Sequence, residues 1–394
     1  MRTLIVLALL SLVACVPDDA SAPDRWFKGN LHTHSLWSDG DEFPEVIMQW
    51  YADQGYHFVG LSDHNILQEG EKWVKIPNNP IRRGAFEAYL GQFGPEWVQY
   101  REDSTALEVR LQTLDVYRSL FERPDSFLIL KSEELTSRFE GKPVHINVTN
   151  VDSLIPAASG NSLLEVMQNN IDAVMARRAA SGQPMFPHIN HPNFGWAIDA
   201  AVMKELKNER FFEVYNGHPL VHNYGDSTRQ GTEAMWDEIN LHYLRVGKPL
   251  MYGLATDDSH NYHSFGPEYS NAGRGWVQVR ADKLTPDALI AALEAGDFYA
   301  STGVELSAYE VSETGIRLEI LPAPGVTYTI AFLAAGVEDE ATELRETING
   351  NSATYAFRSG DRLVRARITS SKDKHNPFKP GDKEMAWTQP IALP

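Results

Sequence analysis

A short apolar segment that ends in a histidine or a carboxylate recurs along roughly the first 260 residues of the chain. One such segment ends at His32 and His34, another at His64, and the last at Asp258 and His260. Apolar strands that alternate with helices form largely parallel sheets, and functional groups collect at the carboxyl ends of those strands. The pattern therefore predicts an α/β fold in which these side chains share one rim.

Helical and strand-like patterns divide the chain into two parts. Apolar spacing predicts helices over residues 44–56 and 163–180, and residues 66–125 read as an insertion that walls the pocket, with a helix over 106–121. From residue 304 to 394 the chain instead alternates apolar and polar residues, with turns between the segments. We therefore expect a small all-β, sandwich-like domain after the α/β part.

The amino terminus predicts export. Residues 1–14 hold one basic residue and an apolar run too short to span a bilayer, which is typical of a signal peptide. The run ends in Leu-Val-Ala before Cys15, as in a bacterial lipobox, so lipid on Cys15 would hold the protein on a membrane through a tether over residues 15–25. The predicted location is that of an exported, membrane-anchored lipoprotein on the periplasmic or cell-surface face. A plain signal peptide with an incidental cysteine is the alternative.

Charge and motif content narrow the function. The formal net charge of −18 argues against binding of duplex nucleic acid, but a locally positive metal site would still attract a small phosphorylated substrate. Cys15 is the single cysteine, which excludes an intramolecular disulfide and a cysteine-based zinc site. Neither a Gly-x-Ser-x-Gly nor a P-loop motif occurs, so serine hydrolases and P-loop nucleotidases are excluded.

Candidate metal ligands stand at or just after the predicted strands. They are His32, His34, Asp39, His64, Glu134, His145, His191, Asp258 and His260. Imidazole and carboxylate together suit zinc, manganese or iron, and nine such groups exceed what one ion can use. The sequence therefore predicts a site for several ions.

The order of these motifs resembles the PHP (polymerase and histidinol phosphatase) superfamily of metal-dependent phosphoesterases. The resemblance covers roughly residues 26–303 and is carried by His32-Thr33-His34, Asp39-Gly40, Ser62-Asp63-His64, Glu134-Leu135-Thr136, His145, His191-Pro192 and Asp258-Ser259-His260. It implies a distorted (βα)7 barrel that holds two or three divalent transition-metal ions (zinc, manganese or iron).

The resemblance also implies a role for each ligand. The first ion would be held by His32, His34, Glu134 and Asp258. Glu134 would bridge to a second ion completed by His145 and His191. The third position would be formed by Asp39, His64 and His260. Many members of the superfamily have histidine where this chain has Asp39, although an aspartate subgroup exists.

Two choices between neighbouring residues follow from the same resemblance. Glu134 is preferred to Glu133 because it fits the Glu-apolar-Thr pattern, and adjacent residues on a strand face opposite sides. His191 is preferred to His188 because a proline follows it, which leaves His188 as a supporting or core histidine.

The predicted function is that of a metal-dependent phosphoesterase. It would hydrolyse a small phosphomonoester, a nucleotide or an oligonucleotide end with a metal-activated water. Glu134, Asp258 and His260 are the expected catalytic ligands, and Arg274 and Arg138 are candidate phosphate clamps. Two alternatives remain: a metallohydrolase of amide or other ester bonds on the same barrel, and a lipoprotein that binds a metal or a solute without catalysis.

Overall fold

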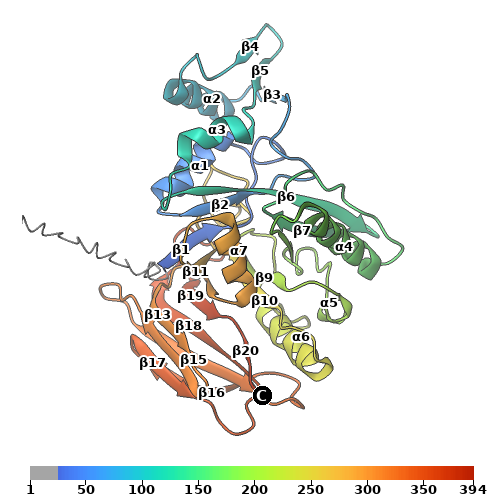
Figure 1. Ribbon diagram of the computed structural model, residues 1–394. Coiled ribbons are helices and arrows are strands. Elements are labelled where there is room, and N and C mark those ends of the chain that lie inside the picture. The colour runs from blue at the N-terminus through green and yellow to red at the C-terminus, as the bar shows by residue number, and fades with distance from the viewer. Residues whose placement is uncertain (1–24) are drawn as a thin grey trace, which may run out of the picture.

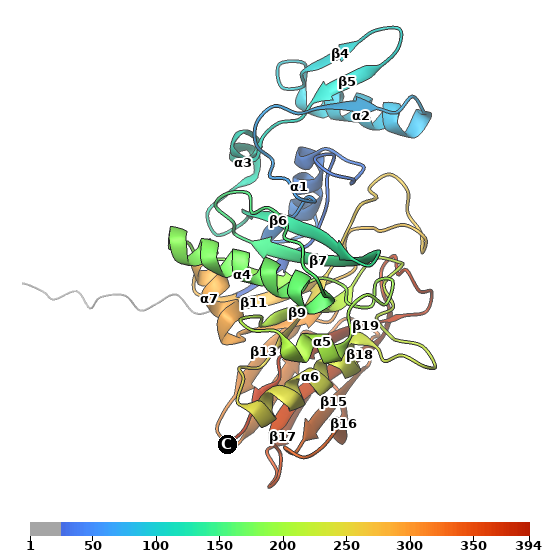
Figure 2. The ribbon, with the colours of Figure 1, turned by 90° about the vertical axis from the view of Figure 1, so that its right-hand side faces the viewer.

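The computed structural model describes residues 25–394 (Figures 1 and 2). The predicted signal peptide and the predicted lipid site at Cys15 lie outside these residues. Within the described part of the chain, no helix is both long enough and apolar enough to cross a membrane.

Seven strands of the amino-terminal part lie side by side in one large sheet. In the order of the sheet they are β10 (Tyr252–Thr256), β9 (Phe211–Asn216), β8 (Phe186–Ile189), β7 (Lys142–Thr149), β6 (Leu128–Phe139), β2 (Phe58–Leu61) and β1 (Arg25–Asn30). Thr33, just after β1, forms a parallel bridge with Ser259, just after β10. The two ends of this run of strands therefore meet at the edge that carries the predicted ligands.

The direction of β7 departs from the prediction of parallel strands. A tight turn at Glu140 and Gly141, both with positive φ, joins β6 to β7, so the two strands form an antiparallel hairpin with no helix between them. β7 is also antiparallel to β8. His145 therefore reaches the rim from the first half of its strand rather than from a carboxyl end.

Helices follow several strands of the large sheet and cover it. They are α1 (Pro44–Asp53), α4 (Leu163–Ser181), α5 (Ala200–Glu205), α6 (Thr232–Val246) and α7 (Pro286–Ala295). The sequence sets the ends of α4, because the side chain of Ser162 accepts a hydrogen bond from the Glu165 amide and Gly182 ends the helix in a left-handed conformation. The predicted helix over 163–180 thus matches α4 closely.

The insertion forms a small unit of its own. It comprises β3 (Trp73–Ile76), α2 (Pro80–Phe93), β4 (Tyr100–Glu102), β5 (Leu107–Arg110) and α3 (Leu114–Phe121). The single helix predicted over 106–121 is wrong, because residues 107–110 pair with β3 and β4 and only 114–121 are helical. The insertion packs around Trp37 and Phe43, behind the loop that carries Asp39.

The carboxyl-terminal part consists of strands. After β11 (Trp276–Ala281) and β12 (Phe298–Ser301) come β13 (Leu306–Val311), β14 (Gly315–Ile320), β15 (Tyr328–Ala335), β16 (Glu343–Asn349), β17 (Ser352–Ala356), β18 (Leu363–Asp373), β19 (Lys383–Thr388) and β20 (Ile391–Ala392). Figures 1 and 2 both place β15, β16 and β17 at the opposite end of the molecule from the insertion.

Two layers of these strands enclose a buried core. The sheet β13-β14-β17 packs on the strands β19, β18 and β15 through apolar side chains such as Ile316, Phe332, Tyr355 and Val364. β19 also pairs with β12, and β12 with β11 and then β1. The large sheet therefore runs without a break across the predicted domain boundary at residue 303.

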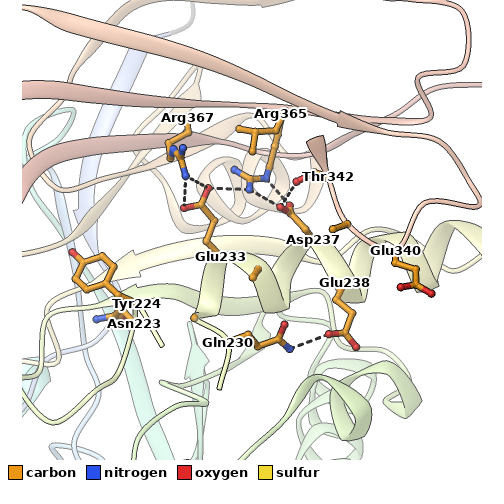
Figure 3. A pocket seen from close by; sticks show the side chains of 14 residues that line it. Asn223, Tyr224, Gln230, Glu233, Asp237, Glu238, Glu340, Thr342, Arg365 and Arg367 are labelled. Carbon is orange, nitrogen blue, oxygen red and sulfur yellow. Dashed lines mark hydrogen bonds and ion pairs between the residues drawn. The ribbon is translucent and has the colours of Figure 1, made fainter. Parts of the chain in front are cut away.

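Ion pairs join α6 to the face of the carboxyl-terminal sheet (Figure 3). The guanidinium of Arg365 on β18 is almost fully buried, and it contacts Asp237 at 2.7 Å and Glu233 at 2.9 Å. Arg367 on the same strand contacts Glu233 at 3.3 Å. The two parts of the chain are thus held together by buried charge as well as by strand pairing.

Candidate metal centre

One cavity of about 370 Å³ opens at the edge where the strand ends meet. Its wall is formed by Asp39, His64, Glu134, His145, His191, Phe194, His218, Asp258, His260, Asn261 and Ser270. No residue of the insertion lines it, so the expectation that residues 66–125 wall the pocket is not met. The remaining predicted ligands, His32 and His34, do not line the cavity and are fully buried.

The first group of ligands gathers around the two histidines after β1. The chain stays extended past Asn30, so His32 and His34 face the same side while Thr33 turns toward Ser259. Their Nε2 atoms lie 3.1 Å apart and 3.2 to 3.3 Å from Oδ1 of Asp258. Both also lie 3.3 to 3.5 Å from Oε2 of Glu134. Donors bonded to a tetrahedral zinc ion at its usual bond lengths stand about 3.3 Å from one another, which matches this spacing.

Glu213 fixes the orientation of His32. Its Oε1 lies 2.6 Å from Nδ1 of His32, so Nδ1 carries the ring proton and Nε2 presents its lone pair to the other ligands. Glu213 also accepts hydrogen bonds from the hydroxyl of Thr256, the amide of His191 and the side chain of Asn216. A carboxylate behind a ligand histidine is a recurrent feature of metal sites.

Glu134 connects the first group to a second. Its Oε1 lies 2.9 Å from Nδ1 of His145 and 3.8 Å from Nε2 of His191, while Oε2 faces the first group. Nε2 of His191 is also 3.8 Å from Oδ2 of Asp258. Glu133 points to the other side of β6, where it accepts a hydrogen bond from the amide of Ile155. The structure thus places Glu134, and not Glu133, among the histidines.

The third group lies at the mouth of the cavity. Asp39 approaches Nε2 of His64 at 3.5 Å and Nε2 of His260 at 3.4 Å. Nδ1 of His260 donates to the carbonyl oxygen of Asp258 at 2.9 Å, which leaves Nε2 of His260 with its lone pair toward Asp39. Nδ1 of His64 contacts the hydroxyl of Thr136 and Oε2 of Glu134. All nine predicted ligands therefore lie together in three adjoining groups.

The protonation states of His34 and Glu134 suit metal binding. Burial, together with the nearby His260 and His64, lowers the pKa of His34 to about 3. Burial alone would raise the pKa of Glu134, yet His64, His145 and His32 hold it well below its usual range. At neutral pH the site thus offers a neutral imidazole and an ionised carboxylate, the forms that bind metal. Facing carboxylates, by contrast, outweigh burial and raise the pKa of His32, His64 and His260, so those rings must release a proton when a metal binds.

Two further observations fit cations between these side chains. Oε2 of Glu134 and Nδ1 of His145 are buried, and although charged atoms lie close to both, none of these contacts with described residues has the geometry of a hydrogen bond. His191 and Asp258 both adopt positive φ, of 24° and 50°, a conformation that is costly for residues with a side chain and that collects at functional sites. The donor set fits a metal centre, and the strained backbone at two of its members is typical of a functional site.

The structure corrects the roles predicted for the two arginines. Arg274 is buried, and its five N–H groups donate to the carbonyl oxygens of Gly217, Gly266, Tyr269 and Asn376 and to the side chain of Asn271. It therefore has no donor left for a phosphate and instead ties three loops together. Arg138 is exposed near the tip of the β6–β7 hairpin and does not line the cavity.

Asp63 and Asp257 support loops rather than ligand histidines. Asp63 accepts hydrogen bonds from Ser35, Ser38 and Gln68. Asp257 accepts them from Asn30, Tyr51 and the backbone amides of residues 273–275. The residue that the sequence reasoning missed is Glu213, whose signal was a single carboxylate inside the otherwise uncharged strand Phe211–Asn216.

We predict that Glu213→Gln weakens metal binding by about 10- to 100-fold. In glutamine an NH₂ group takes the place of one of the two carboxylate oxygens. If Oε2 is the oxygen replaced, the NH₂ group faces two other donors, the amide of His191 and the side chain of Asn216, which now donate to Oε2. Isothermal titration of the metal-free protein with zinc or manganese measures the effect.

Glu209→Gln is the matched control for this prediction. Glu209 is buried four residues earlier and accepts hydrogen bonds only from the amides of Arg210 and Phe211 among the described residues. Metal affinity should therefore stay unchanged in Glu209→Gln. Equal affinities in the two variants would rule out the orienting role of Glu213.

No family model matches the chain, and no curated protein sequence matches it. Among solved structures, a two-domain protein of Bacteroides vulgatus containing a predicted PHP-like metal-dependent phosphoesterase aligns over 98% of this chain and 100% of its own, with 15% identity and a TM-score of 0.41. A proposed metal-dependent phosphoesterase of Bifidobacterium adolescentis covers 62% of this chain and 92% of its own, with 11% identity and a TM-score of 0.31. Likenesses this weak carry no weight for the chemistry of this chain, which rests on its own residues.

Proposed function

We propose that this protein is a PHP-type, metal-dependent phosphoesterase that acts on a small phosphomonoester, a nucleotide or an oligonucleotide end. The observation that carries the proposal is the convergence of nine histidines and carboxylates, from segments as far apart as residues 32 and 260, on one place in the fold, where seven of them line a cavity. We further propose that the seven strands from β1 to β10 form the distorted (βα)7 barrel of that superfamily, which the bridge between Thr33 and Ser259 supports.

The side chains divide the work of the site. His32, His34, Asp258 and Glu134 would hold one ion, His145 and His191 would complete a second site with Glu134, and Asp39, His64 and His260 would form the third. Divalent ions bound there supply a Lewis acid for a phosphoryl oxygen and lower the pKa of a coordinated water toward 7. Glu213 keeps His32 in the tautomer that binds metal, and Asn216 holds Asp258 through a hydrogen bond of 3.1 Å.

We predict that the full chain, purified with metal present, holds at least two transition-metal ions and releases phosphate from a simple aryl phosphomonoester. A chelator should abolish phosphate release, and added zinc, manganese or iron should restore it. The reason is that the ligand side chains of the cavity would act on the substrate only through the ions that they hold. Elemental analysis and a phosphate-release screen over nucleotides, sugar phosphates and short oligonucleotides make the measurement.

Parallel assays with aryl esters and amides separate the alternatives. Fewer than one ion per chain after metal-replete purification would refute the proposal as a whole. Hydrolysis of an amide or carboxylic ester without phosphate release would identify a metallohydrolase of another bond. Metal binding without any hydrolysis would identify a binding protein.

A further inference from the structure

His218 lines the cavity but is not a candidate metal ligand. Among the residues that line the cavity, only Phe194, His218, Asn261 and Ser270 are not candidate ligands. The hydroxyl of Ser270 donates to the carbonyl oxygen of Asp258, and the side-chain amide of Asn261 contacts Asp41 and the amide of Ser270. His218 is therefore the non-ligand side chain in the described cavity wall that retains a strong, uncommitted donor.

The tautomer of His218 follows from its own loop. Nδ1 accepts a hydrogen bond from the backbone amide of Leu220 at 3.2 Å, so in the neutral ring this nitrogen carries a lone pair. The proton must then lie on Nε2, at the far side of the ring from that backbone contact. Nε2 has no hydrogen-bond partner within residues 25–394, and it is not enclosed by protein.

The ring is held in place from several directions. Phe194 and His260 meet it edge-on, at centroid distances of 5.6 and 5.7 Å. The amide of His218 donates to Oδ1 of Asn216 at 2.8 Å, and Nδ2 of Asn216 donates to the candidate ligand Asp258.

Gly217 fixes the preceding backbone. Its carbonyl oxygen accepts from Arg274 at 2.9 Å, and a Cβ at this position would come within 2.8 Å of both Arg274 and the carbonyl oxygen of Asp257. Because the backbone before His218 is packed this closely, the donor on its ring is held in position before a substrate binds.

We propose that His218 is a substrate-binding residue whose Nε2 donates a hydrogen bond to a non-bridging oxygen of the substrate phosphoryl group. The assignment rests on the proposed phosphoesterase function and deepens it. The cavity wall contains no arginine or lysine among the described residues, so a neutral donor at this position would orient the phosphoryl group while the bound cations balance its charge. His218 thus takes the part that the sequence had assigned to Arg274.

The test compares two variants of the full chain loaded with metal. His218→Phe keeps an aromatic ring against Phe194 and His260 but removes the donor, whereas His218→Gln keeps an N–H group at a similar distance from the backbone. Loss of one hydrogen bond to a charged oxygen should lower kcat/KM for an aryl phosphate, and the affinity for inorganic phosphate, by about 10- to 100-fold in His218→Phe. His218→Gln should recover part of both.

Two controls make the result decisive. His222→Ala removes a histidine four residues further on, which stacks on Trp196 and does not line the cavity, and it should leave both quantities unchanged. The metal content of His218→Phe should equal that of the wild type; a loss of metal would overturn the assignment, because His218 would then act through the ligands.

Phosphate titration separates failure of this assignment from failure of the proposed function. If the wild type hydrolyses phosphate esters and His218→Phe matches it within about twofold in both measurements, only the role of His218 is refuted. If the wild type binds metal but releases no phosphate from any ester, the proposed function fails. Unchanged affinity of His218→Phe for inorganic phosphate would then refute the role of His218 as well.

Discussion

Replacing His32 and His34 together by alanine is expected to reduce phosphate release by at least about 10³-fold, because metal ions supply several kcal/mol of transition-state stabilisation in such sites. Both Nε2 atoms lie within 3.5 Å of the same carboxylate oxygens, so the double variant removes half of the first group of ligands. It should also lose at least one bound ion, which elemental analysis of the purified protein detects.

The carboxylates left behind explain why this effect should be so large. Glu134 and Asp258 would remain buried without the two replaced histidines, and Glu134 would keep its contacts with Asn190 and with the second and third groups. His242→Ala, on the outer part of α6, is the control and should retain full activity and metal content. If the double variant still binds the wild-type number of ions, the first group is not a metal site.

The ligands of the site could be predicted from the sequence because each follows from local information. His32 and His34 alternate on an extended segment, and Asp258 and His260 repeat that spacing after another apolar strand. Strand ends at one edge of a sheet lie close together, whichever segments connect the strands. The convergence of these residues therefore did not depend on the direction of any single strand, which is why the reversal of β7 left His145 in the site.

The supporting residues could not be predicted because their partners are distant in sequence. Arg274 looked like a free cation, but its donors are used by carbonyl groups of residues 217, 266, 269 and 376. Those carbonyl positions are set by tertiary packing of separate loops. The role of Glu213 likewise depends on His32, which lies 181 positions away.

The insertion shows where periodicity misleads. Leu107, Val109 and Leu111 alternate as in a strand, while Leu114, Tyr117 and Phe121 follow a helical spacing, so one apolar run contains two periods. Pairing of residues 107–110 with β3 and β4 decided the first half. The helix prediction was wrong because it extended the helical period of the second half over residues whose own alternation is that of a strand.

The carboxyl-terminal strands are more than an appended module. Asn376, in the connection between β18 and β19, accepts a hydrogen bond from Arg274 through its carbonyl oxygen and donates one to Asn271 through its side chain. Arg274 in turn binds the carbonyl oxygen of Gly217, next to His218. The strands that the sequence presented as a separate domain thus help to position the loops around the metal centre.

The ion pairs between α6 and the carboxyl-terminal strands should make the stability of the protein sensitive to single substitutions. Asp237→Ala is expected to lower the free energy of unfolding by about 3 to 5 kcal/mol. Figure 3 shows Asp237 and Glu233 meeting the guanidinium of Arg365, whose side chain is 1% exposed. Removal of Asp237 leaves the buried guanidinium with Glu233 as its carboxylate partner. The loss is costly because Nη1 of Arg365 already lacks a hydrogen bond to any described residue. Urea denaturation followed by circular dichroism gives the free energy.

Two variants determine whether buried charge is the cause. Glu238, the next residue on α6, pairs with Lys204 at the surface, so Glu238→Ala should cost less than about 1 kcal/mol. Arg365→Met combined with Asp237→Leu removes both charges and should be more stable than Asp237→Ala alone, because an apolar pair avoids a buried guanidinium that has lost one of its two carboxylate partners. If the double variant is instead the least stable of the three, then packing of the Arg365 side chain, and not its charge, holds α6 on the sheet.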